Sequence, residues 1–137
     1  MTILEYAYKF IGKPYVWGGD GSGKHGGGLD CSGFVVECLN AFGIVQGDFT
    51  AQSLYKRLLD LGWVSVPRGL EMGADVVFWG KSTGNITHTS LAIGDGLQIE
   101  AGGGGSKCKT PETSTGMVRV RPLAMRSDWV AALRKPK

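Results

Sequence analysis

The amino-acid sequence predicts an α+β fold, in which N-terminal helices pack on a mostly antiparallel sheet of about five strands. Up to about residue 62, apolar residues recur at the three- to four-residue spacing of an amphipathic helix. After residue 62 they alternate with polar residues, as in a strand with one buried face. Gly94-Asp95-Gly96, between two alternating segments, is typical of a hairpin turn, which makes the strands that it joins antiparallel.

The length and composition indicate one domain over residues 1–137. Of the 137 residues, 42% are hydrophobic and 20% charged, close to the averages of globular domains. No apolar run approaches the ~18–20 residues that a membrane span needs, so we expect no membrane insertion. The first five residues contain no basic residue and no long apolar stretch, so we also expect no signal peptide.

Three helices are expected in the first half of the chain. Thr2 and Glu5 have the spacing of a capping box, so the first helix should begin at Ile3 and end at Gly12 and Pro14. Its apolar positions are Ile3, Leu4, Ala7, Tyr8 and Ile11. The second helix should run from an N-cap at Asp30 to Gly43, and the third from Thr50 to Gly62.

The second half of the chain is expected to form the strands and one short helix. The alternating segments are residues 63–66, 75–79, 87–93, 97–101 and 117–121. Residues 127–133 are expected to form a short closing helix. We expect two flexible loops, 18–28 and 102–116. The first matches two nucleotide-binding patterns by letter, but it lacks the buried strand before it and the immediate helix after it that those sites need.

Positive charge is concentrated at the C-terminal end. Residues 105–137 contain eight Lys or Arg and two Asp or Glu, whereas residues 1–104 contain seven and ten. Such a segment either attracts a polyanion, for example a cell-wall polymer, or serves only solubility. Trp129 is its only aromatic residue and it has no nucleic-acid motif, so we expect no nucleic-acid partner.

Cys31 is the candidate nucleophile among the three cysteines. It lies at the first turn of the second expected helix, where free backbone N–H groups favour an anionic thiolate. Cys38 lies among apolar residues of the same helix and fits a buried structural cysteine. With Cys108 the number is odd, so at least one thiol is free. No zinc-ligand spacing occurs, and we expect no metal.

His88 and Glu100 are expected to lie on the same face of the sheet. Alternation places His88 with Ser90 on a polar face, and Glu100 with Gln98 on the corresponding face of the next strand. The two faces coincide if the hairpin pairs residues whose numbers have an even sum. A three-residue loop that pairs Ile93 with Leu97 does this, whereas a two-residue Asp95-Gly96 turn does so only if a bulge restores the register.

Five blocks of the sequence resemble the NlpC-type cysteine peptidases, papain-like hydrolases of bacterial peptidoglycan, over about residues 3–105. The block DCSGF after YxWGG is the most specific. The blocks are Pro14–Gly19 (PYVWGG), Asp30–Val35 (DCSGFV), Thr50–Gln52 (TAQ), Asp75–Trp79 (DVVFW) and His88–Ala101. Two features depart from the family pattern: the glycine-rich loop 20–29 is long, and Gly73-Ala74-Asp75 replaces the usual Pro-Gly-Asp.

The resemblance implies roles for the following residues. Cys31 corresponds to the nucleophile, His88 to the general base and Glu100 to the third, orienting residue, which in many members is a second histidine. Three further residues correspond to positions near the nucleophile or in contact with substrate: Tyr15, Asp30 and Ser32.

The resemblance also implies a function. We expect a papain-like hydrolase that cleaves peptidoglycan stem peptides between D-γ-glutamyl and the diamino acid through an acyl-enzyme. The alternatives are an N-acetylmuramoyl-L-alanine amidase and a related thiol acyltransferase. No cofactor is expected. We expect a monomer, made in the cytoplasm, that acts at the cell wall after release or delivery, as a phage lysin or effector does.

Overall fold

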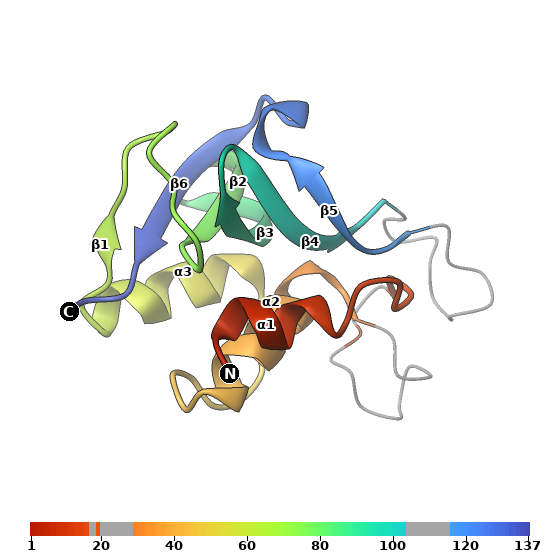
Figure 1. Cartoon of the computed structure of the whole chain (residues 1–137). Helices are drawn as coiled ribbons and strands as arrows, with labels where there is room; N and C mark the ends of the chain where they lie inside the picture. Colours follow the sequence, from red (N-terminus) through yellow and green to blue (C-terminus); the bar gives the residue numbers. More distant parts are fainter. Residues whose placement is uncertain (17–18, 20–28, 104–115) are drawn as a thin grey trace.

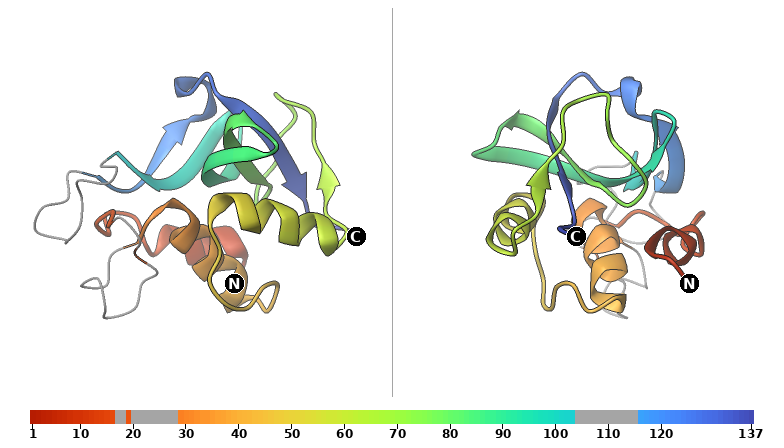
Figure 2. Two further views of the ribbon diagram at one scale, coloured as in Figure 1. Left: turned by 180° about the vertical axis from the view of Figure 1, so that it is seen from behind. Right: turned by 60° about the vertical axis from the view of Figure 1, so that its left-hand side comes forward.

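The computed structural model describes residues 1–16, 19, 29–103 and 116–137. Three helices cover one face of a curved antiparallel sheet (Figures 1 and 2). The helices are α1 (Ile3–Tyr8), α2 (Cys31–Ala41) and α3 (Ala51–Asp60). The predicted α+β class is therefore confirmed.

The sheet contains six strands in the order β1-β6-β2-β3-β4-β5. A short 3-10 helix, η4 (Leu123–Met125), joins β5 to β6. The strands are β1 (Val64–Ser65), β2 (Val76–Ser82), β3 (Asn85–Gly94), β4 (Leu97–Gly102), β5 (Met117–Pro122) and β6 (Trp129–Arg134). Because β5 and β6 belong to this sheet, the described part of the basic C-terminal segment is built into the fold.

The helices begin where their capping residues predict. The Thr2 side chain accepts from the Glu5 N–H and the Glu5 carboxylate accepts from the Thr2 N–H, which completes the capping box of α1. Helix α1 ends at Tyr8, before the predicted Gly12. Of the apolar positions expected for this helix, Ala7 is buried, whereas Tyr8 and Ile11 are exposed.

The expected closing helix at residues 127–133 is wrong, because this segment forms β6. The strand lies between β1 and β2, where Ala132 pairs with Val77 and Leu133 with Val76. Ala132 and Leu133 are both fully buried, and they belong to clusters on opposite faces of the sheet. A strand buried on both faces shows no alternation, so its short apolar run cannot be distinguished from a helix by periodicity.

The sheet carries a hydrophobic cluster on each face. The larger cluster lies between the helices and the sheet and includes Phe34 of α2, Leu54 of α3 and Phe78 of β2. The smaller cluster, on the opposite face, consists of Val66, Val77, Trp79, Ala92 and Ala132. Burial on both faces fixes the strand register, since a slip of one residue would exchange the two sets of side chains.

The β3–β4 hairpin has the two-residue turn, and its register is restored by a bulge. Gly94 pairs with Leu97 across Asp95-Gly96, so the structure has the two-residue alternative and not the three-residue loop that pairs Ile93 with Leu97. Both turn residues have positive φ, 54° and 75°, as a type I′ turn requires. Past an irregularity between Ala92 and Gly94, Ala92 pairs with Gln98. These numbers have an even sum, so His88 and Glu100 lie on the same face.

The β2–β3 hairpin is fixed from two sides immediately before His88. The register shifts between Trp79, which pairs with His88, and Gly80, which pairs with Ile86. A Cβ at Gly80 would lie 2.3 Å from the backbone oxygen of Asn85. On the helix side, the amide of Gln52 accepts from the Ile86 N–H and donates to the backbone oxygen of Thr83, each at 2.8 Å.

We expect Gly80→Ala to destabilise the protein by about 1–3 kcal/mol, because the added methyl group overlaps the β3 backbone. Gly84→Ala is the matched control in the same hairpin, where the nearest atom to an added Cβ is the Ser82 hydroxyl at 3.9 Å. Its free energy of unfolding should stay within about 0.5 kcal/mol of the wild type. Urea unfolding measures both, and equal stabilities of the two variants would contradict the close approach at Gly80.

Candidate active site

Cys31 is the first residue of α2, and Asp30 before it caps this helix. The Asp30 carboxylate accepts from the backbone N–H of Gly33 at 2.6 Å and from the Ser32 hydroxyl at 3.3 Å. The first backbone hydrogen bond of the helix runs from the Phe34 N–H to the Asp30 carbonyl. The N–H groups of Cys31 and Ser32 come before this first bond, so they have no partner within the helix. Cys31 itself is half-buried.

His88 lies between Cys31 and Glu100. Its Nε2 donates to the Glu100 Oε1 at 2.8 Å, and its ring lines the same pocket as Cys31, which helps to raise the pKa of His88. Because Nε2 is directed at the carboxylate, Nδ1 is the nitrogen left for the sulfur. His88 and Glu100 are both buried, 7% and 2% exposed. The structure thus brings the three predicted catalytic residues together.

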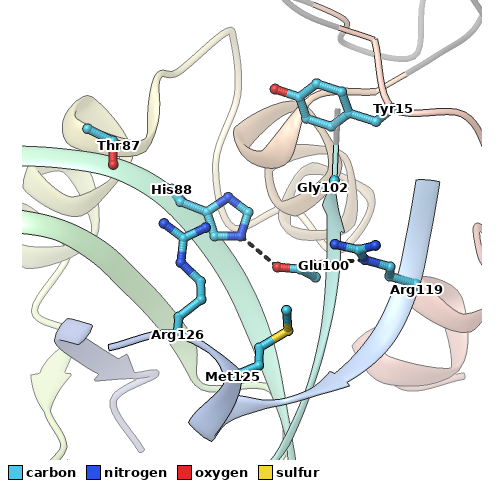
Figure 3. Close-up of a pocket in the computed structure, with 9 residues that line it drawn as sticks. Tyr15, Thr87, His88, Glu100, Gly102, Arg119, Met125 and Arg126 are labelled. Atoms are coloured by element: carbon cyan, nitrogen blue, oxygen red, sulfur yellow. Dashed lines mark hydrogen bonds and ion pairs between the residues drawn. The ribbon is translucent and has the colours of Figure 1, made fainter. Parts of the chain in front are cut away.

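Glu100 is held by a second partner that the sequence analysis missed. Arg119 lies directly opposite Glu100 on the neighbouring strand β5, and its Nε donates to the Glu100 Oε2 at 3.2 Å. Figure 3 shows the carboxylate between His88 and Arg119. The glycines after Glu100 leave room for this pair, since a Cβ at Gly102 would lie 3.0 Å from Oε2 and one at Gly103 2.8 Å from the Arg119 Nη1.

The pKa shifts of His88 and Glu100 favour an ion pair. Burial lowers the pKa of His88, but the hydrogen bonds and charges of Cys31 and Glu100 outweigh it and raise the pKa to about 9. Burial raises the pKa of Glu100, but His88 and then Arg119 outweigh it, so the net shift is downward. At neutral pH the imidazole is therefore protonated and the carboxylate ionised.

Two pockets meet at His88 and share Tyr15, Thr87 and His88. The first, which we call the cysteine pocket, has a volume of about 310 Å³. Its other lining residues are Asp30, Cys31, Ser32, Thr50, Ala51 and Ile86. The second, which we call the arginine pocket, has a volume of about 330 Å³. Its other lining residues are Glu100, Gly102, Gly103, Arg119, Met125 and Arg126 (Figure 3).

Tyr15 is positioned by the backbone on both sides of it. Its N–H donates to the Gly116 carbonyl at 3.0 Å, and the next N–H, of Val16, donates to the Leu29 carbonyl at 3.1 Å. These bonds hold Tyr15 beside the segment that leads into Cys31, at the junction of the two pockets. Asp30 and Ser32 line only the cysteine pocket, so all three expected contact residues lie at the cleft.

Gly73-Ala74-Asp75, which departs from the family pattern, lines neither pocket. Ala74 has a φ of 72°, a left-handed conformation that a glycine adopts with less strain. Asp75 is buried and accepts two hydrogen bonds from Arg134, at 2.8 and 3.0 Å. The segment therefore joins β2 to β6 and does not shape the cleft.

Several expectations lie outside the described residues. These are the two flexible loops, apart from residues 19, 102, 103 and 116, and the cysteine at position 108. Within the described residues, no three His, Cys, Asp or Glu side chains are grouped as metal ligands. No described helix is long and apolar enough to cross a membrane.

Comparison with known proteins identifies the same family as the sequence motifs. The NlpC/P60 family model matches residues 12–126. Protein P54 of Enterococcus faecium is 34% identical over 101 residues, which cover 73% of this chain and 17% of P54. The bifunctional muramidase/DL-endopeptidase CwlT of Bacillus subtilis is 29% identical over 106 residues, covering 76% of this chain and 30% of CwlT. The chain thus spans less than a third of either relative.

A solved structure of similar length confirms the expected papain-like fold of this family. It is the NlpC/p60 domain of the peptidoglycan hydrolase SagA, with a TM-score of 0.68 and 28% identity. The match covers 98% of this chain and 97% of the SagA domain.

We expect iodoacetamide at pH 6.5 to label Cys31 ahead of Cys38 and Cys108. Cys31 is half-buried at the start of α2 and lines a pocket with His88, so the reagent can reach its sulfur. Cys38 is fully buried, and burial raises its pKa to about 12. Peptide mapping of the alkylated protein measures the three rates. The matched control is His88→Ala, which should slow labelling of Cys31 alone. Faster labelling of either other cysteine, or an unchanged Cys31 rate in His88→Ala, would contradict the thiolate–imidazolium pair.

Proposed function

The chain belongs to the NlpC/P60 family, and from this premise we propose that it is a cysteine peptidase that hydrolyses an amide bond of bacterial peptidoglycan. The observation that carries the proposal is that Cys31 and His88 line one pocket, while Nε2 of His88 donates to the Glu100 carboxylate. This is the arrangement of nucleophile, base and orienting group that acyl transfer requires. The names of SagA, a peptidoglycan hydrolase, and CwlT, a DL-endopeptidase, support the substrate.

The first half of the proposed reaction forms an acyl-enzyme. The Cys31 thiolate attacks the amide carbonyl, and the oxygen that becomes negative lies near the backbone N–H of Cys31 at the start of α2. His88 then gives its proton to the amide nitrogen as the C–N bond breaks. The products are a thioester on Cys31 and a free amine.

The second half releases the acyl group. With its proton lost to the amine, His88 is neutral and accepts a proton from water as the water oxygen attacks the thioester. The carboxylic acid leaves, and the proton on His88 restores the thiolate–imidazolium pair. Glu100 keeps the imidazole in one orientation through both halves and stabilises its charged form.

We propose that the bond cleaved is that between D-γ-glutamyl and the diamino acid of the stem peptide, with the acyl part of the substrate in the cysteine pocket. Tyr15, Asp30 and Ser32 would contact it there, since all three line this pocket. The name DL-endopeptidase of CwlT supports this bond over the N-acetylmuramoyl-L-alanine bond of an amidase.

We also propose that residues 1–137 act as a single, monomeric catalytic domain at the cell wall, as a lysin or a delivered effector would. The basic residues of segment 105–137 support attraction to the anionic polymers of the wall. Three of them lie close together in the sequence: Arg134 is the last residue of β6, and Lys135 and Lys137 come after it.

Purified sacculi incubated with the protein test the function and the bond together. We expect new amino groups at the diamino acid, and fragments that end in D-glutamate, both identified by mass spectrometry. Cys31→Ala and His88→Ala should abolish the release, and Glu100→Gln should reduce it about 10²-fold or more through loss of the charge on the orienting group. The matched controls, Cys108→Ala and His25→Ala, remove the same side-chain types at positions with no proposed role.

The products separate the alternatives. A new L-alanine amino group would identify an amidase, and transfer of the acyl group to an added amine without hydrolysis would identify an acyltransferase. No new amino group from any sacculus, or full activity of Cys31→Ala, would overturn the proposed function.

A further inference from the structure

The positions of the nucleophile and the proton donor orient the substrate across the two pockets. The carbonyl carbon must approach Cys31, and the leaving nitrogen must approach His88, which protonates it. The acyl part therefore lies in the cysteine pocket, and the substituents of the leaving amine continue past His88 into the arginine pocket. This orientation rests on the proposed function.

Positive charge dominates the arginine pocket. Arg119 and Arg126 line it, and the only carboxylate among its described lining residues is Glu100. Both Glu100 oxygens are already used, one by His88 and the other by Arg119. The pocket thus retains positive charge that its own carboxylate does not balance.

Arg126 is held rigidly at this pocket and has hydrogen-bonding capacity to spare. Its Nε and Nη2 donate to the two Asp128 carboxylate oxygens at 2.9 and 2.8 Å, which fixes the plane of the guanidinium. Its Cζ lies 5.7 Å from the centre of the Trp79 ring. Among the described residues, Nη1 forms no hydrogen bond, and Asp128 does not line the pocket.

We propose that the arginine pocket is a subsite for a carboxylate on the residue that supplies the leaving amine, with Arg126 as the residue that recognises it. A guanidinium already fixed by an ion pair and a ring loses little side-chain entropy when it binds a second anion. The specificity that follows is for peptides in which this residue has a free carboxylate, against peptides in which the same group is a carboxamide or is absent.

The test uses two synthetic peptides that differ only in this group, carboxylate or carboxamide, on the residue after D-γ-glutamyl. We expect kcat/KM of the wild type to favour the carboxylate by about tenfold or more, as one charge-assisted hydrogen bond provides. Arg126→Gln should bring the ratio of the two values close to one. Binding of both peptides to Cys31→Ala, measured by calorimetry, gives the same comparison without cleavage.

Two controls separate recognition from a structural role. Asp128→Asn removes the charge of the same ion pair but keeps the guanidinium, so the preference for the carboxylate should persist. Arg57→Gln removes one positive charge from the exposed side of α3 and should leave the ratio unchanged. A wild type without preference, or an Arg126→Gln protein that slows both peptides equally and keeps the ratio, would overturn the proposal. Tighter binding of the carboxylate by Cys31→Ala, without cleavage by the wild type, would support the subsite and contradict the proposed peptidase.

Discussion

The buried hydrogen bond between His88 and Glu100 is the interaction on which the rest of the site depends. It joins two neighbouring strands at 2.8 Å, and both side chains are almost fully excluded from water. A buried charge is costly unless it is paired, so His88 can hold a proton only while Glu100 stays ionised. Arg119 on the third strand supplies the second hydrogen bond to that carboxylate. His88, Glu100 and Arg119 thus form a charged row across β3, β4 and β5. This row supports the imidazole that faces Cys31.

Two irregularities in the sheet place this row where Cys31 can reach it. The bulge after Ala92 offsets the two-residue turn and keeps Glu100 on the face of His88. The second irregularity lies between Trp79 and Gly80 of β2 and shifts the pairing with β3 immediately before His88. There Gln52 of α3 also accepts a hydrogen bond from the backbone N–H of Ile86. Bulges re-aim side chains locally and leave the remaining ladder intact, which explains how a regular core coexists with a site of specific geometry.

Local signals predicted the parts of the molecule that local interactions decide. The sequence predicted three helix starts from residues whose side chains can cap a backbone N–H: Thr2, Asp30 and Thr50. In the structure each of them is the N-cap of its helix. The closing strand β6 could not be predicted, because burial on both faces removes its alternation and only the neighbouring strands make it a strand. Arg119 was missed for a similar reason: an arginine between valines shows alternation, but its partner is set by the pairing of β4 with β5.

Titration of the His88 ring by NMR, in the wild type and in Glu100→Gln, tests the central claim most directly. In the wild type the ring should remain protonated through neutral pH and lose its proton with an apparent pKa of about 9. Glu100→Gln removes the charge but keeps a hydrogen-bonding group, so the midpoint should fall toward or below the ~6.5 of a free imidazole. Equal midpoints in the two proteins would show that Glu100 does not support the charge on His88, and would contradict the account.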